Sequence, residues 1–165
     1  MSNTTTYGIS GNKAPRFLVN QWINGNGKTT APFELSDFNG KFKVVYCFQS
    51  WCRGCHSWGF PALQQMTKAL KNKQDIVFLA IQTVFEGHGE NTYEKLVETQ
   101  KKYNLKIPFG HDPGDENSHN RSKVMYHYRT GGTPWFILID KKNNVVFNDF
   151  HLNIDKTIEF LNTIQ

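Results

Sequence analysis

Hydrophobic residues in this chain form short compact runs, and stretches with helical spacing separate those runs. Three runs are rich in β-branched and aromatic residues and predict buried strands: FKVVYCF (42–48), DIVFLAIQT (75–83) and TPWFILID (133–140). Two further strands are predicted over KIPFGHD (106–112) and VVFNDF (145–150), with a turn at KKNN before the second of them.

The segments between these runs carry the periodicity of amphipathic helices. After the first run, Leu63, Met66 and Leu70 recur at helical spacing, and Pro61 is expected to kink or restart that helix. The other predicted helices cover NTYEKLVETQKKYN (91–104), ENSHNRSKVMYHYR (116–129) and DKTIEFLNTI (155–164).

The part of the chain before residue 42 is less regular. Residues 1–15 are interpreted as a loose lead-in, and residues 16–41 as a hairpin around Asn24-Gly25 followed by a turn. Strands then alternate with helices, and the last two strands form a tight hairpin. This order predicts an α/β fold in one domain over residues 1–165, with a central mixed sheet, helices on both faces and an N-terminal β-hairpin extension.

Charge and composition narrow the classes of partner. The formal net charge is +5, from 19 Lys and Arg against 14 Asp and Glu. The basic residues are scattered and form no dense stripe, so we expect no nucleic-acid partner. No apolar stretch approaches the ~18 residues of a membrane span, so we expect no membrane-spanning segment. We also expect the protein to be a monomer.

The N-terminal sequence MSNTTTYGISGNKAP lacks the charged and apolar regions of a signal peptide. The protein is therefore expected to be cytoplasmic if Met1 is the native start. A periplasmic or other extracytoplasmic location follows if a leader has been removed.

All three cysteines lie in the segment CFQSWCRGCH (47–56). Cys52 and Cys55 come directly after a predicted buried strand and at the start of a helix, where ligands of α/β sheets gather and free N–H groups favour a thiolate. This placement predicts a redox pair in which Cys52 is the nucleophile and Cys55 resolves the mixed disulfide. Arg53 is expected to lower the pKa of Cys52, and Cys47 is interpreted as an inert core thiol.

Two other interpretations of this segment are weaker. His56 completes a C-x-x-C-H haem-attachment motif, but a buried strand leading into the motif argues against haem. A structural zinc site needs four ligands, and a second C-x-x-C is missing. The His-rich segment 111–127, with HDPGDENSHN at its start, could suggest a metal, but loop polarity is the commoner explanation, and we expect no metal site.

Strand VVYCF, the motif SWCRGC and the following helix together resemble the thioredoxin superfamily. More narrowly they resemble its redoxin group, which includes TlpA/ResA-like thiol–disulfide oxidoreductases and the AhpC/TSA peroxiredoxins. The N-terminal hairpin and the segment YRTGGTPWFILIDKKNNVV extend the resemblance over most of residues 13–165. It implies a cis peptide at Thr133-Pro134 beside the cysteine pair, a substrate groove shaped by Thr133 and Pro134, and apolar contacts from Trp51 and Trp135.

The chain departs from its relatives at several positions. Val45 and Gln49 stand where the peroxiredoxin motif has Pro and Thr or Ser. Unlike thioredoxin, the chain has no Pro between its two cysteines, where Arg53-Gly54 stands. ResA-like proteins carry a Glu after the next strand, and Glu86 is the candidate here. If buried, its carboxylate would titrate high and could accept the proton of Cys55; otherwise Glu86 is a plain loop residue.

These observations predict a thiol–disulfide oxidoreductase that exchanges electrons with a protein or small-thiol partner. We expect no organic cofactor, because the disulfide itself carries two electrons. Two alternatives stay open: a thiol peroxidase that uses Cys52, and a non-catalytic binding module that has kept the fold.

Overall fold

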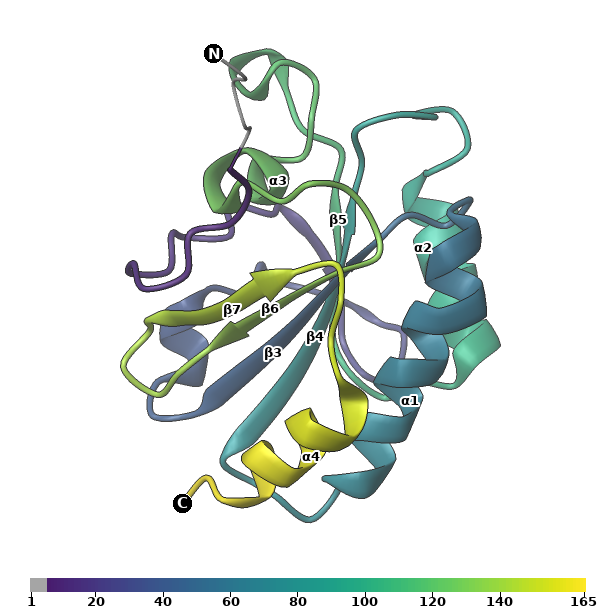
Figure 1. The fold of residues 1–165 in the computed structure, drawn as a ribbon. Coiled ribbons are helices and arrows are strands. Elements are labelled where there is room, and N and C mark those ends of the chain that lie inside the picture. Colours follow the sequence, from purple (N-terminus) through teal and green to yellow (C-terminus); the bar gives the residue numbers. More distant parts are fainter. Residues whose placement is uncertain (1–5) are drawn as a thin grey trace.

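The computed structural model describes residues 6–165 and contains one open sheet with helices on both faces (Figure 1). The seven strands are β1 (Gln21–Ile23), β2 (Thr29–Thr30), β3 (Phe42–Phe48), β4 (Ile76–Thr83), β5 (Phe109–Asp112), β6 (Trp135–Ile139) and β7 (Val145–Asp149). The α-helices are α1 (Phe60–Ala69), α2 (Tyr93–Tyr103), α3 (Lys123–Tyr128) and α4 (Ile154–Asn162). The mixed α/β thioredoxin-like fold predicted from the sequence is confirmed.

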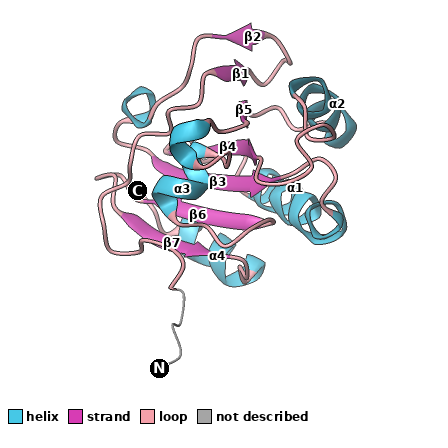
Figure 2. Cartoon of the chain, turned by 90° about the horizontal axis from the view of Figure 1, so that it is seen from above, coloured by secondary structure: helices cyan, strands magenta, loops and turns pink. Residues whose placement is uncertain are grey.

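The strands lie in the order β2-β1-β5-β4-β3-β6-β7, which the view from above displays as a ladder (Figure 2). β3 pairs parallel with β4 and antiparallel with β6, so the sheet is mixed at its centre. The β1–β2 hairpin joins the same sheet through antiparallel pairing of β1 with β5. The predicted N-terminal hairpin is therefore an edge of the central sheet, and β6–β7 forms the opposite edge.

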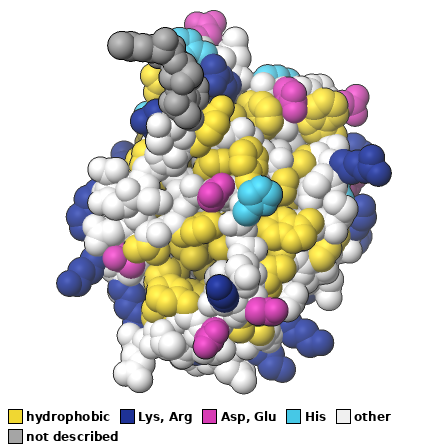
Figure 3. All heavy atoms as spheres, in the orientation of Figure 1, with side chains coloured by type: hydrophobic (Ala, Val, Ile, Leu, Met, Phe, Trp, Pro, Cys, Tyr) yellow, Lys and Arg dark blue, Asp and Glu magenta, His cyan; other side chains and the backbone are white. Residues whose placement is uncertain are grey.

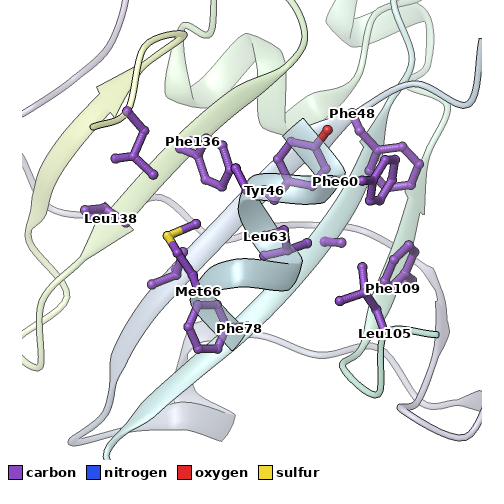
Figure 4. Close-up of a cluster of buried hydrophobic side chains, with 14 of the residues drawn as sticks. Tyr46, Phe48, Phe60, Leu63, Met66, Phe78, Leu105, Phe109, Phe136 and Leu138 are labelled. Atoms are coloured by element: carbon purple, nitrogen blue, oxygen red, sulfur yellow. The ribbon is translucent and has the colours of Figure 1, made fainter. Parts of the chain in front are cut away.

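Two hydrophobic clusters cover the two faces of the sheet, because successive side chains of a strand point to opposite sides. Val44, Tyr46 and Phe48 of β3 belong to the cluster under α1, α2 and α4. Val45 and Cys47 belong to the cluster under α3 and the segment before β1. Figure 4 shows the first cluster, in which aromatic rings of β3, α1 and β6 lie against one another.

The helix predicted over 116–129 is wrong as a single element. The structure has a short 3-10 turn at Glu116–Ser118 and then α3, which begins after the Ser122 cap. His119 and Asn120 between them adopt left-handed backbone angles, which a continuous α-helix of L-residues does not tolerate. A second 3-10 turn, at Leu35–Phe38, fills the turn predicted after the hairpin.

The lead-in before β1 is not loose over the residues that can be described. The N–H groups of Gly8 and Gly11 donate to the carbonyls of Arg129 and Val145, and Lys13 forms a β-bridge with Asn144. The segment thus runs along the β6–β7 edge and brings Tyr7 within 6.3 Å of the Trp135 ring, centroid to centroid. The part of the prediction that concerns residues 1–5 lies outside the described residues.

On the face of the molecule shown in Figure 3, hydrophobic side chains occupy the middle and Lys and Arg side chains lie mostly near the outline. None of the helices between residues 6 and 165 offers the apolar length that a bilayer crossing needs.

Candidate active site

Cys52 and Cys55 lie beyond the carboxyl end of β3 and are joined by a disulfide. Their Cα atoms are 5.3 Å apart, which is an ordinary disulfide separation. Cys52 is half-buried, whereas Cys55 is 0% exposed. The N–H of Cys55 donates to Cys52 Sγ over 3.2 Å, so the outer sulfur already has a donor that can stabilise a thiolate.

The helix that follows the pair does not begin as a regular α-helix. Cys55–Gly59 forms a π-turn, and α1 continues from Phe60 with Pro61 in its first turn, where a missing N–H is tolerated. Beneath the turn, the buried Tyr46 hydroxyl donates to the Cys55 carbonyl over 3.1 Å. A Cβ on Gly59 would lie 2.1 Å from that hydroxyl oxygen, so only glycine leaves room for it. The regular α-helix thus begins at Phe60, directly after the π-turn and one residue before Pro61, where the sequence predicted a kink or a restart of the helix.

The peptide bond between Thr133 and Pro134 is cis, as the resemblance implied. Pro134 packs against the loop between the two cysteines. It lies so near Gly54 that a Cβ at this position would be 3.3 Å from Pro134 Cδ. Gly54 therefore allows the proline strand to approach the pair closely.

A shallow pocket of about 300 Å³ opens beside Cys52. It brings together five residues predicted from the sequence and two that the prediction missed: Trp51, Cys52, Arg53, Glu86 and Thr133, then Gln49 and Phe85. Trp51 is 51% exposed and offers the apolar surface expected of it. Gln49 is buried, and its Nε2 has no hydrogen-bond partner among the described residues. The side-chain amide of Gln49 therefore keeps an unused hydrogen-bond donor group at this pocket.

Of the two interpretations of Glu86, the structure favours the loop residue over the buried carboxylate. Its side chain is exposed, and only its backbone carbonyl is held, by Nδ2 of Asn91 over 3.1 Å. Glu86 therefore lies at the pocket without the burial expected of a proton acceptor.

Trp135 does not offer the substrate contact expected of it. It is 2% exposed, its Nε1 donates to Asn148 Oδ1, and Phe150 packs edge-on against the ring at 4.5 Å. Tyr7 covers it from the lead-in segment. Trp135 therefore belongs to the core at the start of β6.

A belt of buried polar side chains supports the loop before Cys52, and sequence reasoning missed it. Gln82 Oε1 accepts from both the N–H and the hydroxyl of Ser50, and Gln82 Nε2 donates to His111 Nδ1 over 3.0 Å. Burial lowers the pKa of His111 to about 4. The sequence does hold a signal for these buried polar side chains. Two otherwise apolar strands end in polar residues, with QS directly after β3 and QT at the end of β4.

The third cysteine behaves as predicted. Cys47 is free and 0% exposed, and burial raises the pKa of its thiol, with a further contribution from the charge of Asp112. Within residues 6–165, no group of three or more His, Cys, Asp or Glu side chains is arranged to hold a metal ion. In the His-rich region, Ser122 and the N–H of Val124 instead donate to the buried Asp112.

Comparison with known proteins agrees with this geometry. The model of the AhpC/TSA family matches residues 10–148. No curated protein sequence matches the chain.

Solved structures resemble the chain over nearly its whole length. The crystal structure of the thioredoxin-like superfamily protein SPOA0173 is 30% identical with a TM-score of 0.79, over 94% of this chain and 99% of that one. A thiol-disulfide isomerase from Corynebacterium glutamicum is 25% identical with a TM-score of 0.75, over 92% and 98%. A reduced 2-Cys peroxiredoxin from Plasmodium vivax shares the fold at 18% identity, with a TM-score of 0.68 over 97% of both chains.

A disulfide within a C-x-x-C motif, a cis-proline packed against it and these similarities support a redox function. The chain belongs to the AhpC/TSA family, in the redoxin group of the thioredoxin superfamily.

Proposed function

We propose that this protein is a thiol–disulfide oxidoreductase that exchanges two electrons with a protein or small-thiol partner through Cys52 and Cys55. The observation that carries the proposal is the unequal burial of the bonded pair. Cys52 lines an open pocket, whereas Cys55 is fully buried behind it. A partner sulfur can therefore reach Cys52, and only Cys52 can reach Cys55.

When the protein reduces a partner, the Cys52 thiolate attacks one sulfur of a partner disulfide. That S–S bond breaks, one partner thiolate leaves, and a Cys52–partner mixed disulfide forms. Cys55 then loses its proton and attacks Cys52 Sγ, which releases the second partner thiolate and closes the Cys52–Cys55 disulfide. The partner gains two electrons and two protons, and the reverse sequence oxidises a partner dithiol. Because the pair carries both electrons, the proposal needs no organic cofactor.

The residues around the pocket have separate roles in this scheme. Trp51 and Phe85 supply apolar surface, Thr133 lines the pocket beside Cys52, and Pro134 packs against Gly54 between the two cysteines. The exposed Arg53 places a positive charge next to the nucleophile and favours its thiolate.

Trapping with Cys55→Ser tests the proposal. With the resolving thiol removed, Cys52 should hold its partners as stable mixed disulfides, visible on non-reducing gels and identifiable by mass spectrometry. Cys52→Ser is the matched control and should trap nothing. If Cys55→Ser traps nothing in a lysate where an equivalent thioredoxin variant does, the proposal is wrong.

Thiol peroxidase activity is the second candidate, and the match to the AhpC/TSA family favours it. Against it, Val45 and Gln49 occupy the positions of the Pro and the Thr or Ser of the peroxidatic motif, and both are buried. Peroxide consumption coupled to a dithiol reductant tests this activity. Turnover that disappears in Cys52→Ser would support it, and turnover no faster than that of free dithiol would exclude it.

A further inference from the structure

The peptide unit between Ser50 and Trp51, just before Cys52, is held at both ends by side chains. The Ser50 carbonyl accepts a hydrogen bond from Nε2 of His56. The Trp51 N–H donates to Oδ1 of Asn91 over 3.1 Å. Both groups of one peptide unit are thereby fixed from two different parts of the chain, and the path of the backbone into Cys52 is fixed with them.

The hydrogen-bond partners of His56 define its tautomer. A carbonyl oxygen only accepts, so Nε2 carries the proton, and Nδ1 is free to accept from the Tyr103 hydroxyl of α2. The imidazole also stacks on the Tyr103 ring, with centroids 5.6 Å apart and planes inclined by 23°. His56 is thus oriented by α2 and points its one donor at Ser50.

Asn91, which holds the Trp51 N–H, is itself fixed by hydrogen bonds. Asn91 is 2% exposed, and its Nδ2 lies within 3.1 Å of the carbonyls of both Glu86 and Gly87. Its amide therefore cannot turn without losing these contacts.

We propose that His56 is a positioning residue that holds the backbone of Cys52 within reach of Cys55. This inference rests on the redox function proposed above. His56 directly follows Cys55, and Ser50 lies two residues before Cys52, so their hydrogen bond joins the two cysteine segments without passing through the sulfurs. The link persists when the disulfide is reduced, and it raises the effective concentration of one thiol towards the other.

The test compares His56→Leu with His56→Gln. Leucine removes the donor, whereas the terminal amide of glutamine places an N–H group at about the reach of Nε2. Equilibration in glutathione buffers of stepped ratio, followed by alkylation and mass measurement, gives the equilibrium constant for closing the disulfide. We expect His56→Leu to lower this constant about tenfold, which makes the potential about 30 mV less negative. His56→Gln should remain within about threefold of the wild type.

A second measurement follows the mixed disulfide formed between glutathione and Cys52. Its lifetime should lengthen in His56→Leu, because attack by Cys55 slows when the two segments are less well aligned. Should His56→Leu not fold, Tyr103→Phe removes the hydroxyl that orients Nδ1 and should reproduce part of the shift, about threefold.

Gln100→Leu is the control for general destabilisation. Gln100 Nε2 donates to the carbonyls of Asn24 and Ile107, away from the cysteine pair. This variant should lower the melting temperature and leave the potential unchanged. Equal potentials for His56→Leu and the wild type, or an equal loss in His56→Gln and His56→Leu, would overturn the inference alone. A wild-type pair that exchanges with no thiol would overturn the proposed function, and this inference with it.

Discussion

The hydroxyl of Tyr46 lies under the active-site turn and donates a hydrogen bond to the carbonyl of Cys55, 3.1 Å away. Tyr46 stands in β3, the strand just before the cysteine motif. Burial raises the pKa of Tyr46 well above its usual value, so the phenol stays protonated and acts as a fixed donor. Tyr46 thus supports the backbone of Cys55 through a donor that does not titrate in the ordinary pH range.

Gly59→Ala should destabilise the protein by about 2 kcal/mol or more, because the new methyl group would overlap the Tyr46 ring. The Cβ would lie 2.1 Å from the hydroxyl oxygen and 2.7 Å from Cζ, and Tyr46 is fully enclosed and cannot move aside. Denaturant unfolding measures the change. Gly89→Ala is the control, since nothing lies within 4 Å of that position, and it should be nearly neutral. Equal stability of the two variants would contradict the close fit at Gly59.

His111 should make the folded protein less stable as the pH falls from about 6.5 to 4. Burial lowers its pKa to about 4, so the unfolded chain takes up a proton in this window before the folded chain does. Stability attributable to neutral His111 is therefore complete above pH 6.5 and is lost below it. His111→Asn keeps an acceptor for Gln82 and does not titrate. Relative to that variant, the wild type should lose on the order of 2 kcal/mol between pH 7 and 4 in urea titrations. Parallel curves for the two proteins would contradict this assignment.

Alkylation of the reduced, folded protein should modify Cys52 rapidly and leave Cys47 unmodified. The thiolate is the reactive form, and burial both raises the pKa of Cys47 and denies access to its sulfur. Intact-mass measurement after a short exposure to iodoacetamide should find one added group. In denaturant all three cysteines should react. Rapid labelling of Cys47 in the native protein would show that the β3 region opens readily.

Arg53→Gln should raise the pKa of the Cys52 thiol in the reduced protein and slow its reaction with disulfides at neutral pH. The guanidinium is exposed beside the Cys52 pocket, so its effect should weaken as salt screens it. The pH profile of thiolate absorbance near 240 nm, recorded at low and high salt, checks both points. Arg129→Gln is the control, because its guanidinium donates to the Thr6 carbonyl and takes no part in the pocket. An unchanged profile in Arg53→Gln would remove Arg53 from the redox site.

The strongest local patterns predicted the fold well. The run 42–48 became β3 with the same limits, because six of its seven residues are apolar or β-favouring and suit a strand buried on both faces. The cis bond at Thr133-Pro134, which the family resemblance implied, is also present. Burial was harder to predict. Trp135 is enclosed by Tyr7 and Phe150, and no pattern around residue 135 indicates that these two rings meet there.

The local sequence was enough to identify the two cysteines that the structure joins, because Cys52 and Cys55 follow a buried strand and precede a helix. The contacts that hold this segment in place depend on the folded chain. His56, Gln82 and Asn91 come from different parts of the chain and converge on the two residues before Cys52, which are Ser50 and Trp51. A hydrogen bond depends on the positions of two groups in space, whereas spacing along the chain fixes position only within one helix or strand.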